Sequence, residues 1–176
     1  MFGADHVLWE YIGLTIAGVP ILHYFYKKDM DFAGERTLRS RTSTFLLCLG
    51  AVLSIGFRLL FERIGIHGYE EAAASIFTGN RVLEALVLLA ATPLLEEYFF
   101  RGFLYRKFKT WIPVPAAVLC SAAIFGLYHG NISQGIYGFF MGIFLAWTME
   151  HYKTIKAPIL IHMAANGAAL VFQWFL

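Results

Sequence analysis

Long apolar runs alternate with short polar segments along the whole chain. Most of the runs have about the 20 residues that a helix needs to cross the ~30 Å hydrocarbon core of a bilayer. The fourth and fifth runs are short for a full crossing, so we expect tilted or incomplete helices there. The pattern predicts six membrane-spanning helices, at Val7–Tyr26, Thr42–Phe61, Val82–Phe100, Pro113–His129, Gln134–Glu150 and Pro158–Leu176.

The composition supports a protein that lies mostly within the membrane. Hydrophobic residues make up 59% of the chain and charged residues only 15%, whereas a soluble domain is about half apolar and a quarter charged. We therefore expect an all-α, polytopic membrane helical bundle that forms a single integral membrane domain over residues 1–176. The net charge of +2 indicates no nucleic-acid partner, and the lipid bilayer is the expected surrounding.

Basic residues concentrate in alternate loops. They occur in the first, third and fifth loops, whereas the second loop has mixed charge and the fourth has no Lys or Arg. By the positive-inside rule, the basic loops face the cytoplasm and both termini lie outside. We expect a multi-pass protein of the cell inner (plasma) membrane. The basic residues are Lys27, Lys28, Arg36, Arg39 and Arg41, then Arg106, Lys107 and Lys109, then Lys153 and Lys156.

Three short polar patterns interrupt the apolar runs. An ionisable side chain near the bilayer centre costs on the order of 2.5–3.5 kcal/mol even on the mildest scale, so such residues mark chemistry or transport. The patterns are Glu96-Glu97-x-x-x-Arg101, Phe125-x-x-x-His129 and His162-x-x-x-Asn166.

Helix geometry predicts how these side chains are arranged. Residues four apart share a helix face, so Arg101 can neutralise Glu97, while Glu96 points about 100° away and can face another helix. Glu96 and His129 are nearly equidistant from the turn between their helices, which places them at similar depth. His162 can join them if the end of the third helix protrudes into the cytoplasm by a turn or two.

A carboxylate and an imidazole that meet in an apolar cavity can activate water. Glu96 would act as a general base, assisted by His129. His162 and Asn166, one helical turn apart, would donate hydrogen bonds to the oxyanion of a tetrahedral intermediate. Ser121, Ser133 and Cys120 lie in no recognisable nucleophile motif, so we expect direct attack by water without an acyl-enzyme.

The ordered set of three motifs resembles the CPBP family, which comprises type II CAAX prenyl endopeptidases and bacteriocin-processing enzymes, also called Abi proteins. The resemblance covers roughly Val82 to Leu176, so residues 81–176 would form a CPBP-like catalytic core after two N-terminal helices in residues 1–80. It implies an intramembrane endopeptidase that acts on a membrane-associated peptide or protein; members are described both as metalloproteases and as glutamate-dependent peptidases, and we favour the latter. By position, Glu96, His129, His162 and Asn166 would be catalytic. Glu97 and Arg101 would organise the site.

Other interpretations use the same residues. Glu96, His129 and His162 form a possible three-ligand zinc set, although we expect no cofactor. Glu96 and His129 also suit the proton relay of a small proton-coupled membrane transporter, and a non-catalytic membrane factor is a third class. Among peptidase substrates, we favour bacterial peptide maturation or removal of a C-terminal sorting tail.

Overall fold

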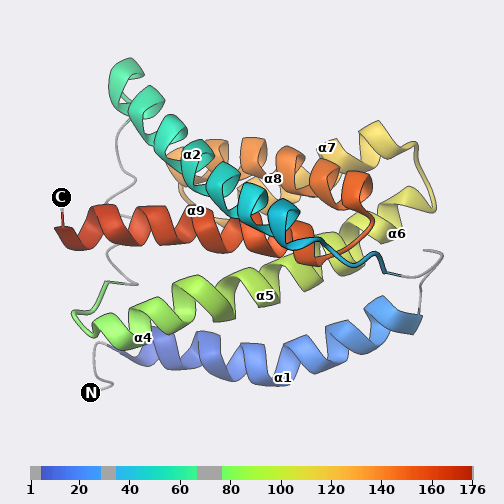
Figure 1. Cartoon of the computed structure of the whole chain (residues 1–176), viewed down its shortest axis with the longest axis horizontal. Helices are drawn as coiled ribbons and strands as arrows, with labels where there is room; N and C mark the ends of the chain where they lie inside the picture. The colour runs from blue at the N-terminus through green and yellow to red at the C-terminus, as the bar shows by residue number, and fades with distance from the viewer. Residues whose placement is uncertain (1–4, 29–34, 67–76, 176) are drawn as a thin grey trace.

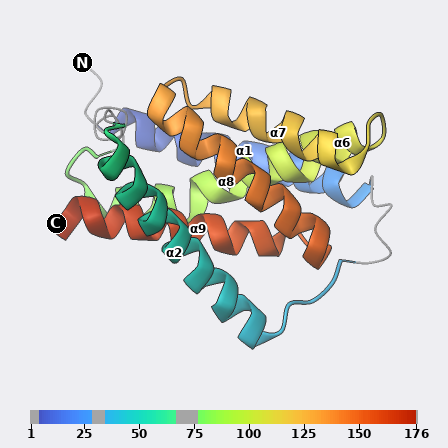
Figure 2. The ribbon, with the colours of Figure 1, turned by 90° about the horizontal axis from the view of Figure 1, so that it is seen from above.

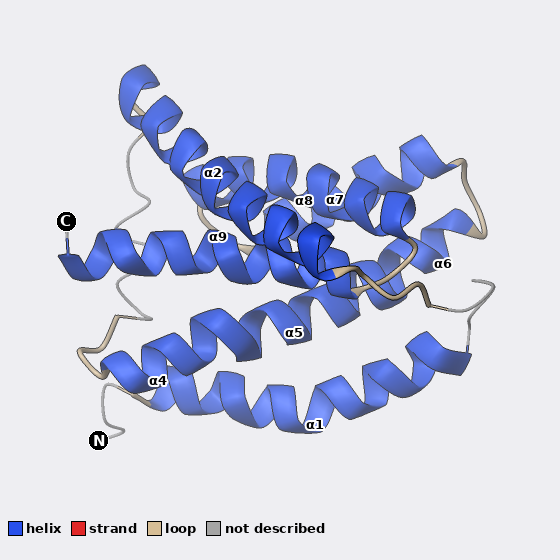
Figure 3. Cartoon of the chain, in the orientation of Figure 1, coloured by secondary structure: helices blue, strands red, loops and turns tan. Residues whose placement is uncertain are grey.

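The computed structural model describes residues 5–28, 35–66 and 77–175. Within these ranges the elements are helices, and no strand occurs in them (Figure 3). Four helices are long and apolar enough to cross a membrane, and α7 (Val114–Tyr128) is apolar but shorter. The four are α1 (His6–Lys28), α2 (Ser40–Ile64), α8 (Ile132–Tyr152) and α9 (Lys156–Phe175).

The sixth helix is a composite rod over residues 81–109, in which α-helical and π-helical turns alternate. Its segments follow one another without a break (Figure 1). With this rod, the predicted all-α membrane bundle of six helices is confirmed. The segments are α4 (Arg81–Leu86), η1 (Val87–Ala91), α5 (Thr92–Glu97), η2 (Tyr98–Tyr105) and α6 (Arg106–Lys109).

The third helix continues beyond its predicted apolar span, which ends at Phe100, as far as Lys109. The apolar run stops at Arg101, but that guanidinium is paired with Glu97 on the same helix, so it does not interrupt the helix. At ~1.5 Å per residue the rod is roughly 42 Å long, longer than the ~30 Å hydrocarbon core. Figure 1 shows its α6 end extending beyond the start of α9, as the sequence predicted.

Three packing relationships build the bundle. α2 crosses α9 obliquely, α7 runs along α8, and α1 packs against the composite rod (Figures 1 and 2). Glycines permit the closest approaches: a Cβ on Gly50 would lie 2.2 Å from the carbonyl oxygen of Ile161, and one on Gly126 would lie 2.6 Å from that of Gly135. Small residues of this kind let membrane helices pack backbone to backbone.

The three basic loops gather at one end of the bundle. Arg36 N donates to Lys153 O, and Arg106 Nη1 donates to the carbonyl oxygen of Tyr26 at 2.8 Å. Burial raises the pKa of the Glu35 carboxyl, but hydrogen bonds from Thr154 and Lys27 outweigh it and hold that pKa below its ordinary value. The loops that the charge pattern groups together are therefore in contact.

The opposite end of the bundle holds the start of α1 and the end of α9 (Figure 1). Asp5 accepts hydrogen bonds from Thr78 and Asn80, and Glu84 accepts one from Trp174 Nε1 at 2.7 Å. These bonds join α1, α4 and α9. The start of α1 and the end of α9 thus lie at the same end of the bundle, and the side of the membrane that this end faces stays a prediction.

We expect Gly50→Ala to destabilise the bundle, because the new methyl group would overlap the Ile161 carbonyl on α9. Overpacking of this kind costs about 1–3 kcal/mol. The matched control is Gly56→Ala on the same helix, where a Cβ meets nothing within 4 Å. Thermal unfolding in detergent, followed by circular dichroism, should show a lower midpoint for Gly50→Ala alone. Equal midpoints would contradict this view of the α2–α9 contact.

Candidate active site

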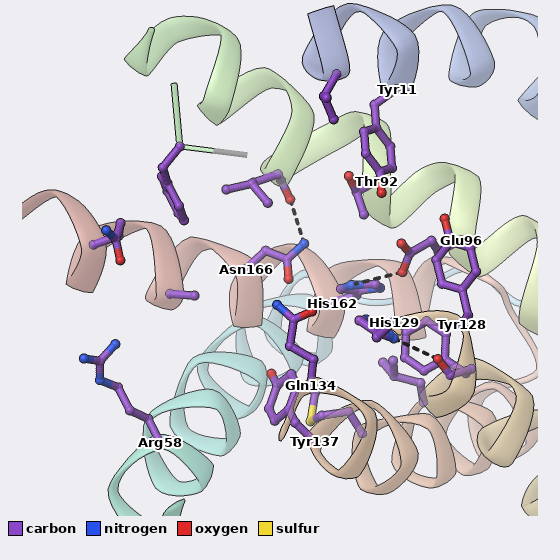
Figure 4. A pocket seen from close by; sticks show the side chains of 18 residues that line it. Tyr11, Arg58, Thr92, Glu96, Tyr128, His129, Gln134, Tyr137, His162 and Asn166 are labelled. Carbon is purple, nitrogen blue, oxygen red and sulfur yellow. Dashed lines mark hydrogen bonds and ion pairs between the residues drawn. The ribbon is translucent and has the colours of Figure 1, made fainter. Parts of the chain in front are cut away.

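A cavity of about 360 Å³ lies inside the bundle (Figure 4). Each of the six helices contributes to its wall. Both polar and apolar side chains line it. The lining residues are Val7, Tyr11, Arg58, Phe77, Leu88, Thr92, Glu96, Phe125, Tyr128, His129, Gln134, Tyr137, Met141, Leu145, His162, Asn166, Ala169 and Gln173.

The four residues that the sequence analysis selected as catalytic all line this cavity. Glu96 projects from α5, His129 follows the last turn of α7, and His162 and Asn166 project from α9 (Figure 4). Three segments far apart in the sequence thus meet at one place. The catalytic roles of these residues remain predictions.

Glu97 and Arg101 are fully buried behind the cavity wall rather than in it. Arg101 Nη1 donates to Glu97 Oε1 at 2.9 Å, and both side chains have 0% exposure. The same guanidinium donates through Nη2 to the Gly142 carbonyl on α8 at 3.3 Å, and it lies 4.2 Å above the Phe125 ring on α7. One arginine therefore connects the composite rod to two neighbouring helices.

Glu97 also holds His162. The Nδ1 atom of His162 lies 2.8 Å from the same carboxylate oxygen that receives Arg101. We assign the proton of this bond to Nδ1, because an ionised carboxylate only accepts. The Nε2 atom of His162 is thereby directed at Glu96, whose Oε2 lies 3.8 Å away. The predicted separation of roles is observed: Glu97 faces Arg101 while Glu96 faces another helix.

His129 is oriented by the backbone of its own helix. Its Nδ1 atom lies 2.8 Å from the Phe125 carbonyl oxygen. A carbonyl only accepts, so we assign the proton to Nδ1, which leaves Nε2 with a lone pair. The Phe125 ring packs edge-on against the imidazole, with ring centroids 4.9 Å apart. His129 can therefore accept a hydrogen bond through Nε2.

Glu96 presents an unpartnered oxygen. The residue is 5% exposed, and among the described residues its Oε2 atom has no hydrogen-bond partner. Its 3.8 Å separation from His162 Nε2 is too long for a direct hydrogen bond, but it is a distance that one water molecule can bridge. This is the geometry that a carboxylate needs to act on water.

Asn166 binds a backbone carbonyl of the composite rod that a π-helical turn leaves without its usual N–H donor. Thr92 N donates to Val87 O, five residues back, so it no longer bonds to Leu88 O. The next donor in the π-helical pattern would be Pro93, which has no N–H. Leu88 O instead accepts from Asn166 Nδ2 at 3.0 Å. One of the two Asn166 N–H groups is thus committed to the fold.

A metal-binding arrangement is not formed. Among the described residues, no group of three or more His, Cys, Asp and Glu side chains has a geometry that could hold a metal ion. The set of Glu96, His129 and His162 considered for zinc lines one cavity, but it does not meet that geometry. We derive no catalytic step through a metal.

Several lining residues were not predicted from the sequence. Tyr11 of α1 and Arg58 of α2 reach the cavity, so the two N-terminal helices contribute to a site that we had assigned to residues 81–176. No motif marks either residue. Thr92, by contrast, had a usable signal, because it lies four residues before Glu96 and thus on the same face of the rod.

Comparisons with known proteins agree with this arrangement. Residues 78–168, just over half of the chain, match the type II CAAX prenyl endopeptidase Rce1-like family. The fold and site are those of an integral membrane helical bundle with a buried cavity of Glu and His side chains. The chain belongs to the type II CAAX prenyl endopeptidase Rce1-like family, and the resemblance inferred from the three motifs is confirmed.

Two curated relatives share part of this sequence. The membrane-embedded CAAX protease MroQ of Staphylococcus aureus (strain USA300) is 34% identical over 87 residues, covering 46% of this chain and 35% of the relative. YdiL of Bacillus subtilis (strain 168), named as a membrane peptidase, is 27% identical over 115 residues, covering 62% and 46%. The matched segments thus span less than half the length of either relative. No solved structure matches the chain.

We expect Glu97→Gln to destabilise the protein strongly, because it leaves the Arg101 guanidinium buried without its counter-charge. Breaking a buried pair in this way costs about 3–5 kcal/mol. Glu62→Gln is the matched control: Glu62 forms an i,i+4 pair with Arg58 but is 57% exposed, and such pairs contribute about 0–1 kcal/mol. Unfolding midpoints in detergent should fall for Glu97→Gln and change little for Glu62→Gln. Similar shifts of the midpoint in the two variants would show that the buried Glu97 carboxylate contributes no more to stability than an exposed ion pair does.

Proposed function

We propose that this protein is an intramembrane endopeptidase, which hydrolyses a peptide bond in a membrane-associated peptide or protein. The observation that carries the proposal is the position of Glu96, His129 and His162 on one cavity within a membrane bundle. Membership of the CAAX prenyl endopeptidase Rce1-like family supports the reaction class. The names of the relatives, a membrane-embedded CAAX protease and a membrane peptidase, point the same way.

The proposed reaction is a direct attack by water. Glu96 takes one proton from the water as the water oxygen adds to the carbonyl carbon, while His129 Nε2 accepts a hydrogen bond from the other O–H, which stays on the oxygen, and so orients the molecule. The tetrahedral intermediate then collapses, the C–N bond breaks, and Glu96 returns the proton to the leaving amine. The described residues that line the cavity include neither Ser nor Cys, and this supports a mechanism without an acyl-enzyme.

The oxyanion would be held from the α9 side of the cavity. Asn166 keeps one N–H group beyond the bond to Leu88 O. His162, in its doubly protonated form, donates through Nε2 while its Nδ1 stays on Glu97. Donors fixed in advance by the fold are the most effective way to stabilise developing charge.

The cavity size guides the proposed substrate class. At about 360 Å³ it is near the small end of ligand pockets, which favours a short stretch of peptide over a peptide together with a long lipid chain. Bacterial peptide maturation and removal of a C-terminal sorting tail are therefore our proposed roles. Family membership favours a peptidase over the transporter and the non-catalytic factor, which use the same charged residues without cleavage.

We expect Glu96→Gln to lower turnover by at least about 10²-fold, because the amide cannot take a proton from water. His129→Ala should also abolish cleavage. The substrate is found first, by comparing protein termini in membranes from wild-type and Glu96→Gln cells. The purified variants are then assayed in detergent with a peptide that spans the cleaved bond.

Glu10→Gln is the control for the glutamate change, because Glu10 is exposed on α1 and does not line the cavity. It should cleave as the wild type does. Wild-type turnover in the Glu96→Gln enzyme would defeat the assignment of the base. Flux through the protein in liposomes, without peptide cleavage, would instead support the transporter.

The same assay tests whether a metal takes part. We expect a strong chelator to leave the turnover of the purified enzyme unchanged, because the mechanism proceeds from Glu96 and His129 alone. Loss of activity on chelation, with recovery on adding Zn²⁺ and not Mg²⁺, would replace this mechanism by a zinc-dependent one.

A further inference from the structure

Thr92 lies in the cavity wall one helical turn before Glu96. Residues four apart share a helix face, and Figure 4 shows both side chains on the side of the rod that borders the cavity. Thr92 is only 9% exposed. Its hydroxyl is therefore enclosed with the carboxylate that we propose as the base.

A threonine within a helix normally donates its hydroxyl to the carbonyl four residues back. Three other described threonines do so: Thr15 Oγ1 donates to Tyr11 O and Thr148 Oγ1 to Phe144 O, both at 2.7 Å, and Thr44 Oγ1 donates to Ser40 O at 3.2 Å. The equivalent acceptor for Thr92 is Leu88 O. That carbonyl already receives Asn166 Nδ2 at 3.0 Å.

The Thr92 hydroxyl makes no such bond. Among the described residues its Oγ1 atom is buried and has no hydrogen-bond partner. A hydroxyl in this state destabilises a fold, and a buried unsatisfied group of this kind calls for an explanation. In a cavity that receives substrate, the explanation is a partner that arrives with the substrate.

We propose that Thr92 is a further catalytic residue, whose hydroxyl donates a hydrogen bond to the carbonyl oxygen of the scissile peptide bond. This inference rests on the proposed peptidase function. Asn166 and His162 are the proposed donors on the α9 side of the cavity, and Thr92 adds a donor on the rod, one helical turn before Glu96. The bond strengthens as the carbonyl oxygen becomes an oxyanion, and Thr92 keeps its proton throughout.

Stability separates this role from a structural one. If the hydroxyl served the fold, its removal would lower the unfolding midpoint. Because it has no partner, Thr92→Val, which replaces the hydroxyl by a methyl group of similar size, should leave the midpoint unchanged or raise it. Thr92→Val should therefore lower the activity without lowering the stability, as expected when a residue serves catalysis at a cost to the stability of the fold.

The experiment compares Thr92→Val and Thr92→Ser with the wild type in the peptide assay. Loss of one oxyanion donor lowers kcat on the order of 10²-fold, so we expect that loss for Thr92→Val with little change in KM. Thr92→Ser keeps the hydroxyl and should recover most of kcat. Thr148→Val is the matched control, because its hydroxyl is buried but satisfied by Phe144 O, and it should keep the wild-type kcat.

The outcomes distinguish the two proposals. Normal kcat in Thr92→Val, in an enzyme that Glu96→Gln inactivates, would overturn the role of Thr92 and leave the peptidase function intact. A low kcat that Thr92→Ser does not restore, or a lowered midpoint in Thr92→Val, would also overturn it. A wild-type protein that cleaves no peptide would remove both proposals. If the valine variant does not fold, Thr92→Ala against Thr92→Ser makes the same comparison.

Discussion

The carboxylate of Glu97 is the point on which the geometry of this bundle depends. In an apolar interior a charge is tolerated only when it is paired and hydrogen-bonded. Glu97 meets that condition by binding Arg101 on its own helix and His162 on α9, while Arg101 reaches a carbonyl on α8 and a ring on α7. The need to neutralise one buried charge therefore brings four helices into a fixed relation, and the cavity lies beside that contact.

Pro93 imposes a second constraint, through the backbone. A helix in a membrane must satisfy its polar groups internally or through a neighbour. The π-helical turn before Pro93 leaves Leu88 O without a backbone donor, and Asn166 provides the replacement. A missing backbone hydrogen bond in the rod thus becomes the attachment point of α9.

Much of this arrangement follows from the sequence, because hydropathy and the four-residue helix repeat act locally. They predict the six helices, the pairing of Glu97 with Arg101, and the shared face of His162 and Asn166. The extension of the rod beyond its apolar run follows from the same reasoning, because Arg101 pairs with Glu97 within the helix and His162 requires this end of the helix to protrude. The contribution of Tyr11 could not be predicted, since it depends on how α1 packs against the rod, and no local pattern encodes that contact.

Gly50 lies on α2, outside the segment that matches the family. The absence of its side chain nevertheless admits the backbone of α9 at Ile161, the immediate neighbour of His162. A chimaera that joined residues 78–168 to unrelated N-terminal helices would keep the three motifs. It would lose Gly50, the residue that lets α2 pack closely against α9. In this chain the packing of α9 therefore depends on a position that no motif marks: a replacement for α2 needs a residue without a side chain at the level of His162.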